Sequence, residues 1–278
     1  MRRFTASDGA EIGYGESGGG RPLLLLHGLM AHSGFWSAQQ PLSDTFRLIA
    51  PDFRGHGQSQ ADPTTVTVDR LTGDVEELAE ALDLRSAIVV GWSLGATVSW
   101  SLLSGPQAHR FAGSVVVDMT PRVLNGGDWQ LGLTADVVET RRTAFREDFR
   151  TFALAAGPAI LAQPVADGKA ALGAWAGDQF ARNNSRAIAT LWDSLAALDQ
   201  RALLPQITQP TLIVHGARSQ LYEAQTARFL ATALPDAQAV QFDGSGHAPH
   251  LEQPELFNTR IRAFAANLKL PNEARTLA

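Results

Sequence analysis

The 278-residue sequence contains no cysteine, which excludes disulfides, thiolate metal sites and a cysteine nucleophile. Long apolar runs are also missing, since the longest, Leu23 to Leu26, is far too short to span a bilayer. The N-terminal stretch MRRFTASDGAEIGYGESGGG has two arginines but no apolar segment behind them, unlike a signal peptide. We therefore expect a soluble, cytoplasmic protein with no membrane partner.

Excess positive charge is absent as well. The formal net charge is −5, and there is neither a basic tail nor a run of like charges. The sequence has no H-E-x-x-H motif and no carboxylate cluster, and the glycines of GYGESGGG lack the spacing of a dinucleotide-binding loop. We expect no nucleic-acid partner, no metal and no cofactor.

Short apolar runs alternate with amphipathic stretches along most of the chain. This order predicts an α/β protein with a mostly parallel sheet, and the continuous apolarity of the runs predicts strands buried on both faces. The expected strands are PLLLLHG (22–28), FRLIAPD (46–52), SAIVVGW (86–92), GSVVVDM (113–119), TLIVHG (211–216) and AVQFDG (239–244).

Two helices and one insertion follow from the same pattern. Leu71, Val75, Leu78 and Leu82 recur at helical spacing, with Asp74, Glu76, Glu77 and Glu80 expected mostly on the opposite side. A last helix is expected from about Pro254, with Phe257, Ile261 and Phe264 buried. Residues 121–205 lack a strong strand, and we expect a helical insertion there.

The stretch GWSLG, Gly91 to Gly95, matches the G-x-S-x-G pattern of a nucleophile elbow. A serine on a sharp strand-to-helix turn needs glycine two residues before and after it, because larger side chains would collide. An apolar strand precedes Ser93 and a helical stretch follows it, so Ser93 is predicted to be a nucleophile.

Four stretches, LLLLHGLMAHSGFW, PDFRGHGQS, VVGWSLGA and GSGHAPHLEQPELF, resemble the α/β-hydrolase fold superfamily, in particular its serine carboxylesterases. The resemblance covers essentially the whole chain. It implies an eight-stranded, mostly parallel sheet with helices on both faces, a core of residues 1–120 and 206–278, and a helical cap of residues 121–205. It also implies an oxyanion hole formed by the backbone N–H groups of Leu29 and Leu94.

The resemblance places the catalytic base on the loop after the last strand, where the sequence GSGHAPH contains two histidines. His247 is the predicted base, and His250 is the alternative. His56, in DFRGHGQS, is interpreted as a structural loop histidine.

The family's acid normally follows the strand written here TLIVHG, but Ser219 stands at that position. Asp118 lies at the end of the preceding strand, which neighbours TLIVHG in the family's strand order. Some family members carry the acid there, and Asp118 is our predicted acid, with Glu223 as the second candidate. The alternative role for Asp118 is that of a turn residue ahead of Pro121.

With these residues, the predicted reaction is hydrolysis of a carboxylic ester of a small, largely apolar molecule through an acyl-enzyme. Trp92, Trp175 and Phe145 are predicted to bind the substrate, although the aromatic residues of the insertion could equally pack it onto the core. Arg142, Arg146 and Arg150 form either an anion-binding stripe or, as we favour, a solvated face paired with Glu139, Glu147 and Asp148.

Two alternatives remain open, a cofactor-free dioxygenase that uses the histidine–aspartate pair as its base and a ligand receptor on a hydrolase scaffold. The motifs GWSLG and GHAP also resemble those of esterases that act on pimeloyl-acyl carrier protein methyl ester. The missing acid after TLIVHG argues against close kinship, so an acyl carrier protein is a less favoured partner than a free ester. The chain is expected to be a monomer or a homodimer.

Overall fold

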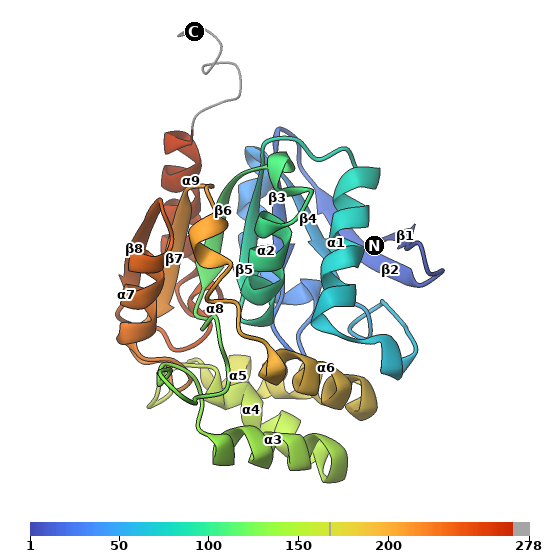
Figure 1. Cartoon of the computed structure of the whole chain (residues 1–278), viewed down its shortest axis with the longest axis vertical. Coiled ribbons are helices and arrows are strands. Elements are labelled where there is room, and N and C mark those ends of the chain that lie inside the picture. The colour runs from blue at the N-terminus through green and yellow to red at the C-terminus, as the bar shows by residue number, and fades with distance from the viewer. Residues whose placement is uncertain (167, 269–278) are drawn as a thin grey trace, which may run out of the picture.

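The structure, a computed structural model, describes residues 1–166 and 168–268. Its centre is one eight-stranded sheet with the strand order β1-β2-β4-β3-β5-β6-β7-β8 (Figure 1). The strands are β1 Arg2–Thr5, β2 Glu11–Ser17, β3 Arg21–Leu26, β4 Phe46–Pro51, β5 Ala87–Trp92, β6 Phe111–Val117, β7 Thr211–Gly216 and β8 Ala237–Phe242.

The sheet is parallel from β4 to β8, whereas β1 and β2 pair in antiparallel fashion at one edge. The α/β-hydrolase arrangement and all six strands expected from apolar runs are confirmed. The residue pattern did not indicate β1 and β2, because their polar, glycine-containing sequences lack a continuous apolar run.

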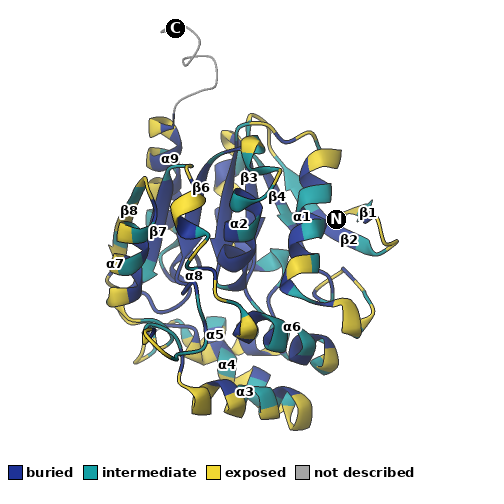
Figure 2. Cartoon of the chain, viewed as in Figure 1, coloured by how far each residue is buried: buried dark blue, intermediate teal, exposed yellow. Residues whose placement is uncertain are grey.

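The central strand β5 is buried along its whole length, as its β-branched and apolar sequence predicts (Figure 2). The expectation of burial was wrong for β8. That strand lies at the edge of the sheet, and Phe242 is its one fully buried residue. The burial of β5 and β8 differs because β5 is central and β8 is at the edge, and the sequence pattern does not reveal a strand's position in the sheet.

Helices flank the sheet, with α1 and α2 in front of it in Figure 1 and α9 packed against η1. Their bounds are η1 Ser33–Asp44, α1 Val68–Ala81, α2 Leu94–Ser104, α3 Ala135–Glu147, α4 Phe149–Ala159, α5 Ala170–Phe180, α6 Ser185–Ala197, α7 Ala224–Ala233, α8 Pro249–Glu252 and α9 Pro254–Asn267. Within the described ranges, none of these helices combines the length and apolarity needed to cross a membrane.

The helices α3 to α6 lie together beyond the carboxyl ends of the parallel strands (Figure 1). Three of them begin with a side-chain cap, since the side chains of Thr134, Asp148 and Asn184 accept backbone hydrogen bonds at the starts of α3, α4 and α6. All four fall within residues 121–205, between β6 and β7 in the chain.

The predicted arginine stripe is interrupted at Asp148, which ends α3 and caps α4, so Arg150 belongs to a different helix. Arg142 pairs with Glu139, as expected, but its other partner is Asp193 of α6, which also pairs with Arg146. Arg142 and Arg146 of α3 are therefore paired mainly with Asp193 of α6, and not with carboxylates of their own helix.

The expected polar side of α1 needs a correction at Asp74, whose side chain is only 4% exposed. Its carboxylate accepts hydrogen bonds from Arg54 and Arg70, and the Arg54 side chain is 1% exposed. At helical spacing Asp74 lies on the same face as Leu71 and Leu78, so the helix buries an ion pair beside its apolar stripe.

Replacing Asp74 with alanine should lower the free energy of unfolding by about 3 kcal/mol, because a buried guanidinium then loses its main partner. Urea denaturation measures this change. Arg85→Ala is the control, because its ion pair with Asp83 is exposed and its removal should leave stability unchanged. Equal effects of the two substitutions would contradict a stabilising role for the buried pair.

Candidate active site

Ser93 lies on the tight turn between β5 and α2, with φ 52° and ψ −120°. Its N–H donates to Val117 O of β6 at 2.9 Å, so the sheet ladder holds the turn in place. The serine therefore has the strained backbone that the G-x-S-x-G pattern predicts.

The two glycines of this turn are sterically required. A Cβ at Gly91 would lie 2.4 Å from the carbonyl group of Gly95, and a Cβ at Gly95 would lie 2.2 Å from Leu26 O. The turn thus packs against both its own helix and the neighbouring strand β3, and no larger residue fits at either position.

Asp118 follows β6 directly, and its N–H donates to Val214 O of β7 at 2.9 Å. Its Oδ2 lies 2.6 Å from Nδ1 of His247, which follows β8, and both side chains are almost fully buried. The strand order confirms that β6 and β7 are neighbours. The structure therefore brings Asp118 and His247 together across 129 residues of sequence.

Ser219, at the position where the family usually carries its acid, donates a hydrogen bond to Asp118 Oδ2 at 2.7 Å. The serine thus orients the carboxylate of the neighbouring strand. Glu223, the second candidate for the acid, is exposed and precedes α7 as its N-cap residue. Of the two candidates, Asp118 is the one hydrogen-bonded to His247.

Two further contacts hold the loop that carries His247. The indole N–H of Trp92 donates to His247 O at 2.8 Å, and the carboxylate of Glu252 accepts from the N–H groups of Gly246 and Ala162, both at 2.7 Å. Burial raises the pKa of Glu252. Nothing in the local sequence pattern indicated this role of Glu252, because its partners are backbone groups.

The backbone near Ser93 offers two N–H groups for an oxyanion. Leu94 is the first residue of α2, so its N–H has no acceptor within the helix. The N–H of Leu29 donates to none of the described residues, and the next N–H in its loop, that of Met30, donates to His56 Nε2 at 3.2 Å. His56 thus positions this loop, in agreement with its interpretation as a structural histidine.

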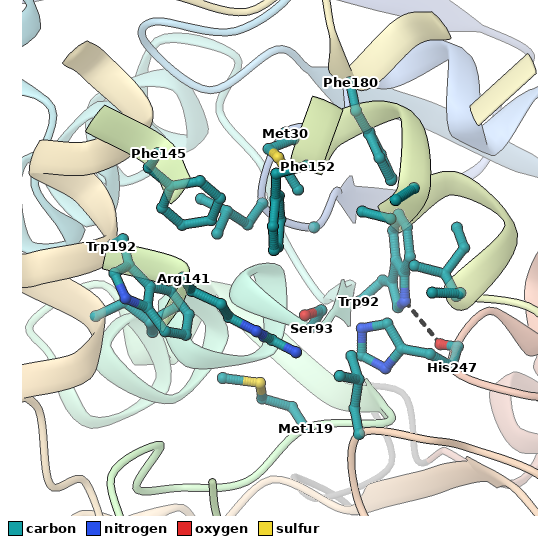
Figure 3. A pocket seen from close by; sticks show the side chains of 18 of the residues that line it. Met30, Trp92, Ser93, Met119, Arg141, Phe145, Phe152, Phe180, Trp192 and His247 are labelled. Carbon is teal, nitrogen blue, oxygen red and sulfur yellow. Dashed lines mark hydrogen bonds between the residues drawn. The ribbon is translucent and has the colours of Figure 1, made fainter. Parts of the chain in front are cut away.

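A cavity of about 260 Å³ opens beside Ser93 and His247 (Figure 3). This volume lies near the lower end of the range for small-molecule sites. Trp92 and Phe145 line the cavity, but Trp175 does not, since its ring packs against Phe35 at 4.6 Å between centroids. The other lining residues are Gly28, Leu29, Met30, Met119, Arg141, Phe152, Ala155, Ala156, Ala159, Ile160, Phe180, Trp192, Leu195, Leu221 and Tyr222.

Three histidines close to this site are fully buried. Burial lowers the pKa of His56 to about 4 and, with nearby histidines, lowers those of His27 and His250 well below the usual value. His27 and His56 have hydrogen-bond partners, whereas neither ring nitrogen of His250 has one among the described residues. The His250 ring packs against Trp36 and Trp92, so it is a core residue rather than a second base.

A family model described as the alpha/beta hydrolase fold matches residues 21–254. The pimeloyl-[acyl-carrier protein] methyl ester esterase of Nitrosomonas europaea is 34% identical over 255 residues, which cover 89% of this chain and 97% of the relative. An esterase of the same name from Aromatoleum aromaticum is 31% identical, over 84% of this chain and 93% of its own length. Because Ser219 stands at the position of the usual acid, we expected lower identities to these esterases.

Solved structures give the same fold. The esterase RhEst1 from Rhodococcus superposes with a TM-score of 0.84 and 27% identity, covering 96% of this chain and 99% of the other. The esterase from Exiguobacterium antarcticum has a TM-score of 0.89 at 23% identity, over 95% of this chain and 99% of the other.

The buried histidines make stability depend on pH. A histidine whose pKa falls on folding is neutral in the native state but takes up a proton when unfolded, so the free energy of unfolding should decrease as the pH falls from 6.5 towards about 4. His250→Phe keeps the aromatic packing and should reduce this slope by about 1.4 kcal/mol per pH unit. Urea denaturation at several pH values in this range measures the slope. Identical slopes for the variant and the wild type would contradict the lowered pKa of His250.

Proposed function

This chain is a hydrolase of the α/β-hydrolase fold family, and we propose that it cleaves a carboxylic ester of a small, largely apolar molecule through an acyl-enzyme on Ser93. The observation that supports this most strongly is the 2.6 Å contact between His247 Nδ1 and Asp118 Oδ2, beside a cavity that Ser93 also lines. A carboxylate at Nδ1 leaves Nε2 available to take the serine proton. We prefer ester hydrolysis to the dioxygenase and receptor alternatives, because two relatives more than 30% identical over most of the chain are named as esterases.

In the proposed first half-reaction, Ser93 Oγ attacks the ester carbonyl carbon while His247 Nε2 accepts the hydroxyl proton. The carbonyl oxygen becomes an oxyanion, which the N–H groups of Leu29 and Leu94 stabilise. Collapse of the tetrahedral intermediate breaks the ester bond, and the leaving alkoxide takes the proton from His247.

In the second half-reaction, water attacks the acyl group on Ser93 and gives its proton to His247. The oxyanion forms again at the same two N–H groups, and its collapse releases the carboxylic acid and returns the proton to Ser93. Asp118 stabilises the imidazolium each time it forms. Ser219, which donates to the same carboxylate oxygen, acts as a positioning residue.

Residues 121–205 are proposed as a cap on a core formed by residues 1–120 and 206–278. The helices α3, α4 and α6 supply seven of the apolar residues that line the cavity, including Phe145, Phe152 and Trp192 (Figure 3). An apolar cavity of this size suits a short acyl or aryl group.

An ester linked to an acyl carrier protein is a second candidate substrate, because the relatives from Nitrosomonas europaea and Aromatoleum aromaticum are named for it. A substrate panel that contains short p-nitrophenyl esters and pimeloyl-acyl carrier protein methyl ester separates the two candidates. The substrate with the higher kcat/KM identifies the class on which the enzyme acts.

Ser93→Ala should reduce hydrolysis of every substrate in this panel to the background rate, because no acyl-enzyme can form. Ser104→Ala, at the far end of the same helix, should retain full activity and controls for effects on folding. Initial rates by absorbance or titration measure both. Residual turnover of the alanine variant close to that of wild type would exclude Ser93 as the nucleophile.

Asp118→Asn should lower kcat by about 10⁴-fold, because the asparagine holds His247 in the wrong tautomer and does not stabilise the imidazolium. Ser219→Ala removes one hydrogen bond to the carboxylate and should cost less than about 10-fold. Glu223→Gln, at an exposed position, is the matched control and should behave as wild type. If Glu223→Gln is the damaging change and Asp118→Asn is mild, the acid has been misassigned.

A further inference from the structure

Among the residues that the structure describes, Arg141 is the one that lines the active-site cavity and carries a permanent charge. It comes from α3, and Figure 3 shows its guanidinium extending past Trp192 into the space that Ser93 and His247 face. Apart from the proposed catalytic pair, the cavity is otherwise lined almost entirely by aromatic and aliphatic side chains. A cation is therefore directed into an apolar site beside the proposed nucleophile.

No ion pair or hydrogen bond satisfies this guanidinium within residues 1–166 and 168–268. Its neighbours on α3 differ, because Arg142 is paired with Glu139 and Asp193, and Arg146 is paired with Asp193. The contact of Arg141 is with the ring of Trp192, whose centroid lies 5.5 Å from the Arg141 Cζ. This contact supports one face of the guanidinium and leaves its N–H donors free.

An unpaired guanidinium in an apolar cavity is costly, and burial lowers the pKa of Arg141. Tyr222 lines the same cavity, and its hydroxyl likewise makes no hydrogen bond to any residue that the structure describes. Burial raises the pKa of Tyr222, so its hydroxyl stays protonated and can donate. The two side chains together offer several donors, and no acceptor among the described residues uses them.

We propose that Arg141, assisted by Tyr222, binds a carboxylate of the substrate, so that the preferred substrates are small esters carrying a carboxylate at the end remote from the ester bond. This inference rests on the proposed ester hydrolysis at Ser93. A carboxylate fits because it matches the planar fork of arginine and adds little volume to a cavity of about 260 Å³.

The test compares kcat/KM for esters of equal length with and without the carboxylate. One series pairs the monomethyl esters of succinate to suberate with methyl esters of the matching monocarboxylic acids. The other pairs acetate esters of hydroxy acids with alkyl acetates, which shows whether the carboxylate belongs to the acyl or the alcohol part. In at least one series, wild type should favour the carboxylate ester by about 10-fold or more, as a charged hydrogen bond provides.

Arg141→Met keeps the side-chain volume and should lower kcat/KM for the carboxylate ester by about 10- to 100-fold, while the neutral ester changes by less than about 3-fold. Arg141→Lys keeps the charge and should retain part of the preference. Arg146→Met, at an exposed position of the same helix, should leave both rates unchanged.

Equal kcat/KM for carboxylate and neutral esters in wild type would overturn the inference without any variant. So would an equal loss on both esters in Arg141→Met. Either result leaves the proposed function intact, provided that the neutral ester is cleaved and that Ser93→Ala abolishes its cleavage. Failure of wild type to cleave any ester would instead overturn the proposed function.

Discussion

The hydrogen bond between His247 and Asp118 is the interaction on which the proposed chemistry depends. It joins the loop after the edge strand β8 to the end of β6, and β7 lies between these two strands. Because parallel strands end at the same edge of the sheet, short loops after three of them are enough to gather the serine, the acid and the base. Trp92 and Glu252 hold the histidine loop through hydrogen bonds to its backbone, and Ser219 holds the carboxylate.

The proposed relocation of the acid to Asp118 has a simple physical basis. The ends of β6 and β7 are adjacent, so a carboxylate after either strand reaches the same imidazole, and the residue that is not the acid is free to support it. Ser219 does this by donating to the oxygen that also contacts His247. A serine at the usual acid position is therefore compatible with a carboxylate hydrogen-bonded to His247.

The sequence alone was sufficient for the parallel part of the sheet and for the turn at Ser93, because continuous apolar runs and the steric requirement at Gly91 and Gly95 are local properties. It was insufficient where the outcome depends on distant partners. Asp74 is buried because Arg54 from another segment neutralises it, and β8 is exposed because it lies at the sheet edge. The guanidinium of Arg141, which pairs with no carboxylate in residues 1–166 and 168–268, was not anticipated either, since nothing in α3 distinguishes it from its paired neighbours Arg142 and Arg146.

Covalent labelling with an organophosphonate ester, followed by intact mass measurement and peptide sequencing, tests most directly whether His247 and Asp118 activate Ser93. An imidazole held by Asp118 should activate Ser93 and no other serine, so we expect a single adduct, located on Ser93, with parallel loss of ester hydrolysis. Continued ester hydrolysis by fully treated enzyme without an adduct at Ser93, or inactivation by an adduct at a different residue, would contradict it.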